Sequence, residues 1–265
     1  MSSCPDGTPI WADAMFPDPV AAQHFYSELL GWTYGEPAME YGGYTQAYSQ
    51  GKAVAGLVPP MPGADAVTPS WNLYLAVKDI DAKARAIQAS GGEPVMEPMK
   101  VGEFGTMLLA KDPSGVHFSV WQPGTHKGFE KQEEPGAFCW AEVTTRDAAA
   151  ADAFFAAVFG YESKRIDDDA LDFHLWNTPG SELPALGRLK MDGGFPAEVP
   201  PFINTYFAVE DCDAALATVR EHGGMVHFGP VDSPFGRFAT VSDPQGATFS
   251  VVDLTVTQGD VPKAA

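Results

Sequence analysis

Along residues 10–16, large or polar side chains alternate with mostly small ones, as they do along a β-strand with two different faces. Trp11, Asp13 and Met15 fall on one face of this predicted strand. The residues between them are mostly alanine, and we expect that smaller face to pack against a helix. Residues 138–144 repeat the pattern, with Trp140 and Glu142 on the matching face.

Helix signals follow each of these strands. Asp18 before Pro19 is typical of a helix start, and Gly31 is typical of a helix end. Two strands are predicted around residues 42–49 and 56–58, followed by another at 72–77. A second helix, beginning at Asp79 and ending at Gly91-Gly92, precedes the final strands. The pattern is strand, helix and then strands, used twice, with helices on one side of the sheet.

The whole pattern occurs a second time in the chain. The segment DPSGVHFSVW, residues 112–121, returns 131 positions later as DPQGATFSVV, with six of ten residues identical. Offsets of 129 to 132 relate the other matching segments, so insertions fall in loops. The predicted fold is α+β, a tandem repeat of two modules. Their predicted limits are 9–122 and 137–254, with a linker at 123–136 and a flexible tail at 255–265. The acidic run at residues 167–169 is predicted to be a solvated loop.

Composition narrows the choice of partners. The chain has 265 residues and a formal net charge of −19, which disfavours nucleic acid and anionic membrane surfaces as partners. No apolar stretch approaches a membrane span, and the N-terminus lacks the features of a secretory signal. Three widely spaced cysteines predict no disulfide framework. We therefore expect a cytoplasmic protein, monomer or homodimer, whose partner is a small-molecule ligand.

Several motifs together resemble the vicinal oxygen chelate superfamily. They are FYSELLGW from Phe25, FFAAVFGY from Phe154, the V-x-D-x-D-A segments at Val77 and Val209, and the two D-P-x-G turns. The superfamily includes glyoxalase I, bleomycin-resistance and fosfomycin-resistance proteins, and extradiol dioxygenases. The tandem form is similar to actinobacterial proteins often labelled glyoxalase-like or hydroxylase. The resemblance implies two βαβββ units per module, forming a curved mixed sheet with one cleft.

The resemblance also implies where a metal would bind. Metal-dependent members carry His or Gln on the first strand, His or Glu on the strand that opens the next unit, and Glu on the last strand. Counting from the helix starts, these positions fall on the following residues of the two modules: Trp11, Asn72 and Ser119; Trp140, Asn204 and Ser250. Indole is not a metal ligand, and neutral amide and hydroxyl oxygens are weak ones. No metal and no other cofactor is predicted, and no catalytic residue is identified.

The same sheet faces predict a binding site for a planar or aromatic ligand. The predicted ligand-binding residues are Trp11, Asp13, Asn72, Tyr74, Ser119, Trp121, Trp140, Glu142, Asn204, Tyr206 and Ser250. Aromatic walls favour planar or cationic guests, and the two acids would favour a basic group. The expected function is resistance, sequestration or detoxification by metal-independent binding.

Other interpretations remain open at this point. Asp13 and Glu142 are equally compatible with solvated acids on an open sheet face. An enzyme of the glyoxalase, dioxygenase or hydroxylase kind could use a displaced metal, with His117, His174 and Glu142 as candidate ligands, or an organic cofactor. A protein-interaction module, with each cleft filled by its own side chains, is a third alternative.

Overall fold

The computed structural model describes residues 4–60, 69–166 and 171–259. The predicted loop at 167–169 and the last six residues of the predicted tail lie outside these ranges. The first half contains β1 Pro9–Met15, α1 Pro19–Leu30, β2 Thr33–Tyr34, the 3-10 helix η1 Met39–Tyr41, β3 Thr45–Ser49, β4 Lys52–Val58, β5 Trp71–Ala76, α2 Ile80–Ala89, β6 Glu93–Pro94, β7 Met99–Val101, β8 Gly105–Lys111 and β9 His117–Pro123. The second half contains β10 Phe138–Thr145, α3 Ala148–Phe159, β11 Glu162–Arg165, β12 Phe173–Asn177, β13 Pro184–Lys190, β14 Phe202–Ala208, α4 Cys212–Glu221, β15 Met225–Ser233, β16 Gly236–Ser242 and β17 Thr248–Asp253.

Each half forms one open mixed sheet, and the two sheets have matching strand orders. The first runs β2-β3-β4-β1-β5-β9-β8-β6, with β7 paired to β8. The second runs β11-β12-β13-β10-β14-β17-β16-β15. At each centre the first strands of the two units lie antiparallel, β1 with β5 and β10 with β14. The predicted α+β tandem fold, with two units per module, is confirmed.

The predicted starts of α1 and α2, and their predicted ends at glycine, are confirmed. The Asp18 carboxylate accepts from the Ala21 N–H at 3.0 Å, and Gly31 ends α1 in the left-handed conformation at φ 68°. Helix α2 ends at Ala89, and Gly91 follows in the left-handed conformation at φ 83°. The Gly91 N–H donates to the Gln88 carbonyl and the Gly92 N–H to the Ile87 carbonyl, the pattern typical of a helix that ends at a glycine.

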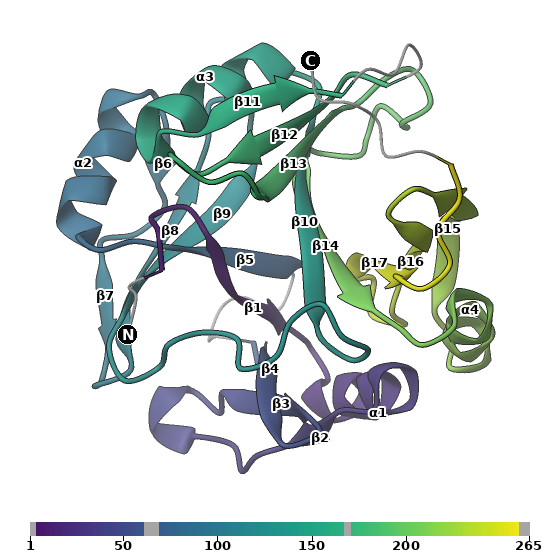
Figure 1. The fold of residues 1–265 in the computed structure, drawn as a ribbon. Helices are drawn as coiled ribbons and strands as arrows, with labels where there is room; N and C mark the ends of the chain where they lie inside the picture. The colour runs from purple at the N-terminus through teal and green to yellow at the C-terminus, as the bar shows by residue number, and fades with distance from the viewer. Residues whose placement is uncertain (1–3, 61–68, 167–170, 260–265) are drawn as a thin grey trace.

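The helix-bearing faces of the two sheets pack against each other (Figure 1). Helix α1 contacts α4, α2 contacts α3, and β5 crosses β14 between these pairs. The rings of Trp71 and Phe207 lie 4.9 Å apart at this crossing. The Tyr26 hydroxyl of the first half donates to the Asp243 carboxylate of the second at 3.0 Å. One hydrophobic core therefore serves both modules, and the opposite sheet faces lie outside it.

The predicted linker is held against the first module. The Phe129 N–H donates to the Ile10 carbonyl and the Glu130 N–H to the Ala53 carbonyl. Lys131 is buried and donates to the Pro135 carbonyl at 2.7 Å. Across the described residues, no helix has both the length and the apolar character needed to cross a membrane.

Candidate functional site

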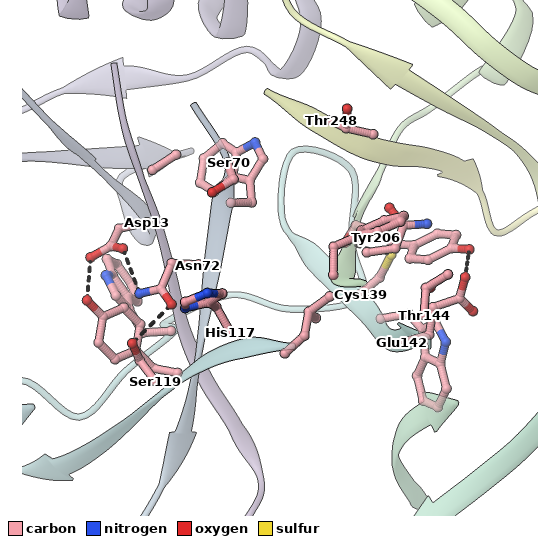
Figure 2. A pocket seen from close by; sticks show the side chains of 18 of the residues that line it. Asp13, Ser70, Asn72, His117, Ser119, Cys139, Glu142, Thr144, Tyr206 and Thr248 are labelled. Carbon is pink, nitrogen blue, oxygen red and sulfur yellow. Dashed lines mark hydrogen bonds between the residues drawn. The ribbon is translucent and has the colours of Figure 1, made fainter. Parts of the chain in front are cut away.

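Four polar side chains of the first module meet on the face that bears no helix. The Asp13 carboxylate on β1 accepts from the Tyr74 hydroxyl at 2.9 Å and from the Asn72 amide at 3.3 Å. The Ser119 hydroxyl on β9 donates to the Asn72 carbonyl oxygen at 3.0 Å. Figure 2 shows this chain of hydrogen bonds running from Asp13 through Asn72 to Ser119. The sequence-predicted residues of these three strands are thus brought together.

The second module builds a related cluster with one difference. The Tyr206 hydroxyl donates to the Glu142 carboxylate at 2.8 Å (Figure 2). The Asn204 amide nitrogen donates to Ser250 Oγ at 2.9 Å, and Ser250 Oγ also lies 3.0 Å from the Thr240 hydroxyl. Asn204 therefore presents its nitrogen to the serine, whereas Asn72 presents its oxygen to Ser119.

Both carboxyl groups are buried, and burial changes their acidity. Asp13 is 9% exposed and Glu142 is 7% exposed. Loss of hydration raises the pKa of Asp13 to about 6, although hydrogen bonds from Tyr74 and Asn72 oppose the rise. The same cause raises the pKa of Glu142 to about 7, again opposed by its tyrosine and asparagine neighbours. The two acids are therefore poised near neutrality and are not the solvated surface acids of one alternative interpretation.

The strand register corrects one part of the sequence interpretation. Asp13, and not Trp11, lies directly opposite Asn72 across the β1–β5 pair. Glu142 likewise lies opposite Asn204 across β10–β14. Counting back from the helix start places the Trp11 indole at this position, two residues before the correct residue, Asp13. The polar set at the implied metal position is therefore Asp, Asn and Ser in the first module and Glu, Asn and Ser in the second.

These residues do not fit a metal ion of the kind that the resemblance implies. Each set has one carboxyl group with a raised pKa, already bonded to a tyrosine, and two neutral donors. On the other side of β1, opposite Asp13, stands Gly56, which has no side chain to offer. No group of three or more His, Cys, Asp or Glu side chains suited to a metal occurs among residues 4–60, 69–166 and 171–259.

The alternative of a displaced metal site that combines His174 with Glu142 is contradicted by the geometry. His174 pairs with Arg188 across β12–β13, and Arg188 lies on the helix side, where it bonds Asp152 of α3 at 3.0 Å. Glu142 pairs with Gly187, so its side chain points to the other face of the sheet. His174 instead bonds the Ser163 hydroxyl through Nδ1 at 2.7 Å. The two proposed ligands cannot reach one ion.

Aromatic and apolar side chains surround both polar clusters. A cavity of about 3250 Å³ is lined by residues of both open sheet faces, including His117. All the predicted ligand-binding residues line it except Ser250, which lies behind Asn204 and is fully buried. The expectation of two separate clefts changes accordingly, because the two faces share a continuous space.

Sequence reasoning missed the aromatic rings that lie over the polar clusters. Tyr44 covers Gly56, and its hydroxyl accepts from the Trp11 indole N–H at 2.7 Å. Phe173 covers Gly187 in the same way. The repeat offsets relate both pairs, since 129 positions separate the rings and 131 separate the glycines. Aligning the two halves around these glycines would have found them.

We expect Gly56→Ala to destabilise the protein by about 1–3 kcal/mol, the usual cost of overpacking. A Cβ at Gly56 would lie 1.8 Å from Tyr44 Oη, so the ring must move. Urea unfolding of the single variants and of Gly56→Ala/Tyr44→Ala measures the coupling. The added methyl group should cost little once Tyr44 is alanine. Equal costs in both backgrounds would show that the ring does not occupy this space.

Comparison with known proteins agrees with this architecture. Residues 10–121 match the Glyoxalase-like domain family, and residues 138–251 match the Glyoxalase/Bleomycin resistance protein/Dioxygenase superfamily. The protein CFP32 of Mycobacterium tuberculosis, which carries a provisional glyoxylase name, is 37% identical over 93% of this chain and 94% of its own. The anthracycline biosynthesis protein DauV of a Streptomyces species is 35% identical, with 94% of each chain covered.

Solved structures share the fold at low sequence identity. The Mn(II)-bound glyoxalase from Novosphingobium aromaticivorans aligns with a TM-score of 0.65 and 18% identity, covering 96% of this chain and 87% of that one. The 2,3-dioxygenase LapB from Pseudomonas aligns with a TM-score of 0.64 and 16% identity, covering 98% and 96%. With two matched domains in tandem and full-length relatives above 30% identity, the chain belongs to the glyoxalase/bleomycin resistance/dioxygenase superfamily.

Proposed function

We propose that this protein binds a planar aromatic small molecule without a metal ion, on the open sheet face that carries a buried carboxyl group. One observation carries the proposal. The carboxyl group of each module is bonded to a tyrosine and lies beside an asparagine and a serine, within aromatic walls. Such a site has apolar surface for a ring and a few fixed polar groups for orientation.

The relatives support the same class of ligand. The name of DauV places that protein in anthracycline biosynthesis, and anthracyclines are planar polycyclic aromatic compounds. Bleomycin-resistance proteins share the matched superfamily description. Sequestration or delivery of an aromatic compound is therefore the role that we propose for this chain.

The alternative of an enzyme with a displaced metal loses its main candidates. His174 lies on the sheet face opposite to that of Glu142. His117 lines the cavity, where burial, and then the neighbouring Lys111, lower the pKa of its imidazole. A cation beside a neutral imidazole opposes the binding of a second cation. The proposed function therefore uses no metal ion.

Elemental analysis and native mass spectrometry of freshly purified protein test the proposal together. We expect no transition metal at stoichiometric level, and we expect aromatic compounds from a planar panel to bind equally before and after dialysis against EDTA. A stoichiometric metal whose removal abolishes ligand binding would contradict the proposal. So would a panel in which non-aromatic compounds of similar size bind as well as aromatic ones.

A further inference from the structure

The two halves of the cavity differ around the tryptophan of each module's first strand, Trp11 in the first module and Trp140 in the second. In the first module Trp11 is 4% exposed, and the linker closes over it. The His126 ring lies 4.5 Å from the Trp11 ring and Phe129 lies 5.4 Å from it. In the second module Trp140 is only half-buried, and no ring of the described residues lies as close to it. The linker therefore fills this part of the cavity in the first module only.

A second difference leaves more room in the second module. Trp121 packs beside Tyr74, and its indole N–H donates to the His126 carbonyl at 3.2 Å. The repeat places Val252 at the corresponding position. Valine is far smaller than tryptophan. The second module therefore has neither the linker nor a second indole to fill this part of the cavity. Phe238 and the exposed ring of Phe228 line the cavity of this module.

The polar clusters differ in whether their hydrogen bonds are complete. Ser119 lies opposite Leu109 on β8, so Asn72 Oδ1 is the partner to which the serine hydroxyl donates. Ser250 lies opposite Thr240 on β16, whose hydroxyl supplies a second partner. Ser250 can therefore accept from the Asn204 amide nitrogen, and the amide takes the reverse orientation. The exchange of leucine for threonine explains this difference.

Two polar atoms at the second module's cluster lack hydrogen-bond partners within the described part of the chain. Among the residues that the structure describes, neither Asn204 Oδ1 nor Thr144 Oγ1 has a hydrogen-bond partner, although both are buried. Both residues line the cavity. A buried acceptor without a donor costs about 1–3 kcal/mol, and a bound molecule that donates to Asn204 Oδ1, once the amide turns toward the cavity, recovers that cost. In the first module Asp13, Asn72 and Ser119 satisfy one another.

We propose that only the second module binds the ligand, and that this ligand is an uncharged aromatic compound carrying an O–H or N–H donor for Asn204 and Glu142. The first half of the cavity is narrowed by its own side chains and by the linker, and the first module supports the second through the shared core. This assignment rests on the proposed function, and it names the site and the ligand chemistry. A neutral donor suits the site because bringing a cation into it would require removing its hydration shell.

The repeat supplies a matched pair of variants to test the location. Thr240→Phe places a ring in the second half of the cavity, and Leu109→Phe places one at the equivalent point of the first. With 2-naphthol as the probe, calorimetry should give one site per chain. We expect Thr240→Phe to weaken binding at least about tenfold and Leu109→Phe to change it less than about twofold. Circular dichroism confirms that each variant is folded.

The donor is tested with 2-methoxynaphthalene, which lacks the O–H of 2-naphthol. We expect it to bind about tenfold more weakly, the usual value of one hydrogen bond to a buried acceptor. Thr240→Leu copies the first module, so Ser250 would donate to Asn204 and remove that advantage. This smaller variant also serves if Thr240→Phe fails to fold.

The outcomes separate this assignment from the proposed function. Two sites per chain, or loss of binding in Leu109→Phe with retention in Thr240→Phe, would overturn the assignment alone. Tighter binding of 1-naphthylmethylammonium than of 2-naphthol would overturn the choice of a neutral donor. If no aromatic compound binds at all, the proposed function fails and the assignment fails with it.

Discussion

Replacement of Trp32 by alanine should lower the free energy of unfolding by about 3–5 kcal/mol, the range for a fully buried tryptophan. Trp32 is 2% exposed and stacks on Tyr26 with ring centroids 5.4 Å apart. It also contacts Phe207 of the second module at 5.5 Å, and its indole N–H donates to the buried Gly136 carbonyl. The variant removes all of these contacts and leaves a buried carbonyl without its donor.

Because this core joins both modules, we expect them to unfold in one transition that shifts as a whole. Guanidinium unfolding is followed by circular dichroism and by tryptophan fluorescence. For each protein, variant or parent, the curves from the two probes should coincide. Trp140→Ala is the control, since this half-buried indole has no close ring partner among the described residues and should cost far less. Two separate transitions, with the second module unaffected by Trp32→Ala, would contradict a shared core.

The sequence predicted the fold well because local signals and the repeat agree. The aspartate caps, the glycine at the end of α1 and the strand alternation are all short-range features, and the structure contains them. The internal duplication then fixed the module plan without any knowledge of long-range contacts. The packing of the two helix-bearing faces could not be read in this way, since contacts such as Trp71 with Phe207 join distant positions.

The site was predicted less completely, for a physical reason. Alternation along a strand gives the face of a side chain but not its neighbour across the sheet, so Trp11 was placed where Asp13 lies. The rings of Tyr44 and Phe173 lie over glycines of the neighbouring strand. The repeat offsets pair the two rings and the two glycines, but the contact of each ring with its glycine depends on the pairing register. The raised pKa values of Asp13 and Glu142 are likewise a consequence of burial, which sequence alone does not specify.

Glu142 should make the protein less stable as the pH rises, by up to about 3 kcal/mol. Its pKa rises from the ordinary 4.5 to about 7 in the folded protein, because burial disfavours the charged form. Between these two values the folded state binds a proton that the unfolded state has released. Stability is therefore fully present below about pH 4.5 and is lost as the pH rises through about 7.

Glu142→Gln removes this titration and keeps an acceptor for the Tyr206 hydroxyl. We expect the variant to be no more stable than the parent at pH 4.5 and to gain on it steadily up to pH 8, by about 3 kcal/mol. Asp13→Asn is the matched control from the first module. Its pKa of about 6 confines the corresponding gain to the window between pH 3.8 and about 6, so that variant should gain nothing further above pH 7.

Urea unfolding at intervals of half a pH unit separates the two windows. A constant difference between Glu142→Gln and the parent from pH 4.5 to 8 would mean that Glu142 is ionised throughout. Glu142 would then carry a full negative charge at neutral pH, and the proposed choice of an uncharged ligand would lose the support of a neutral site.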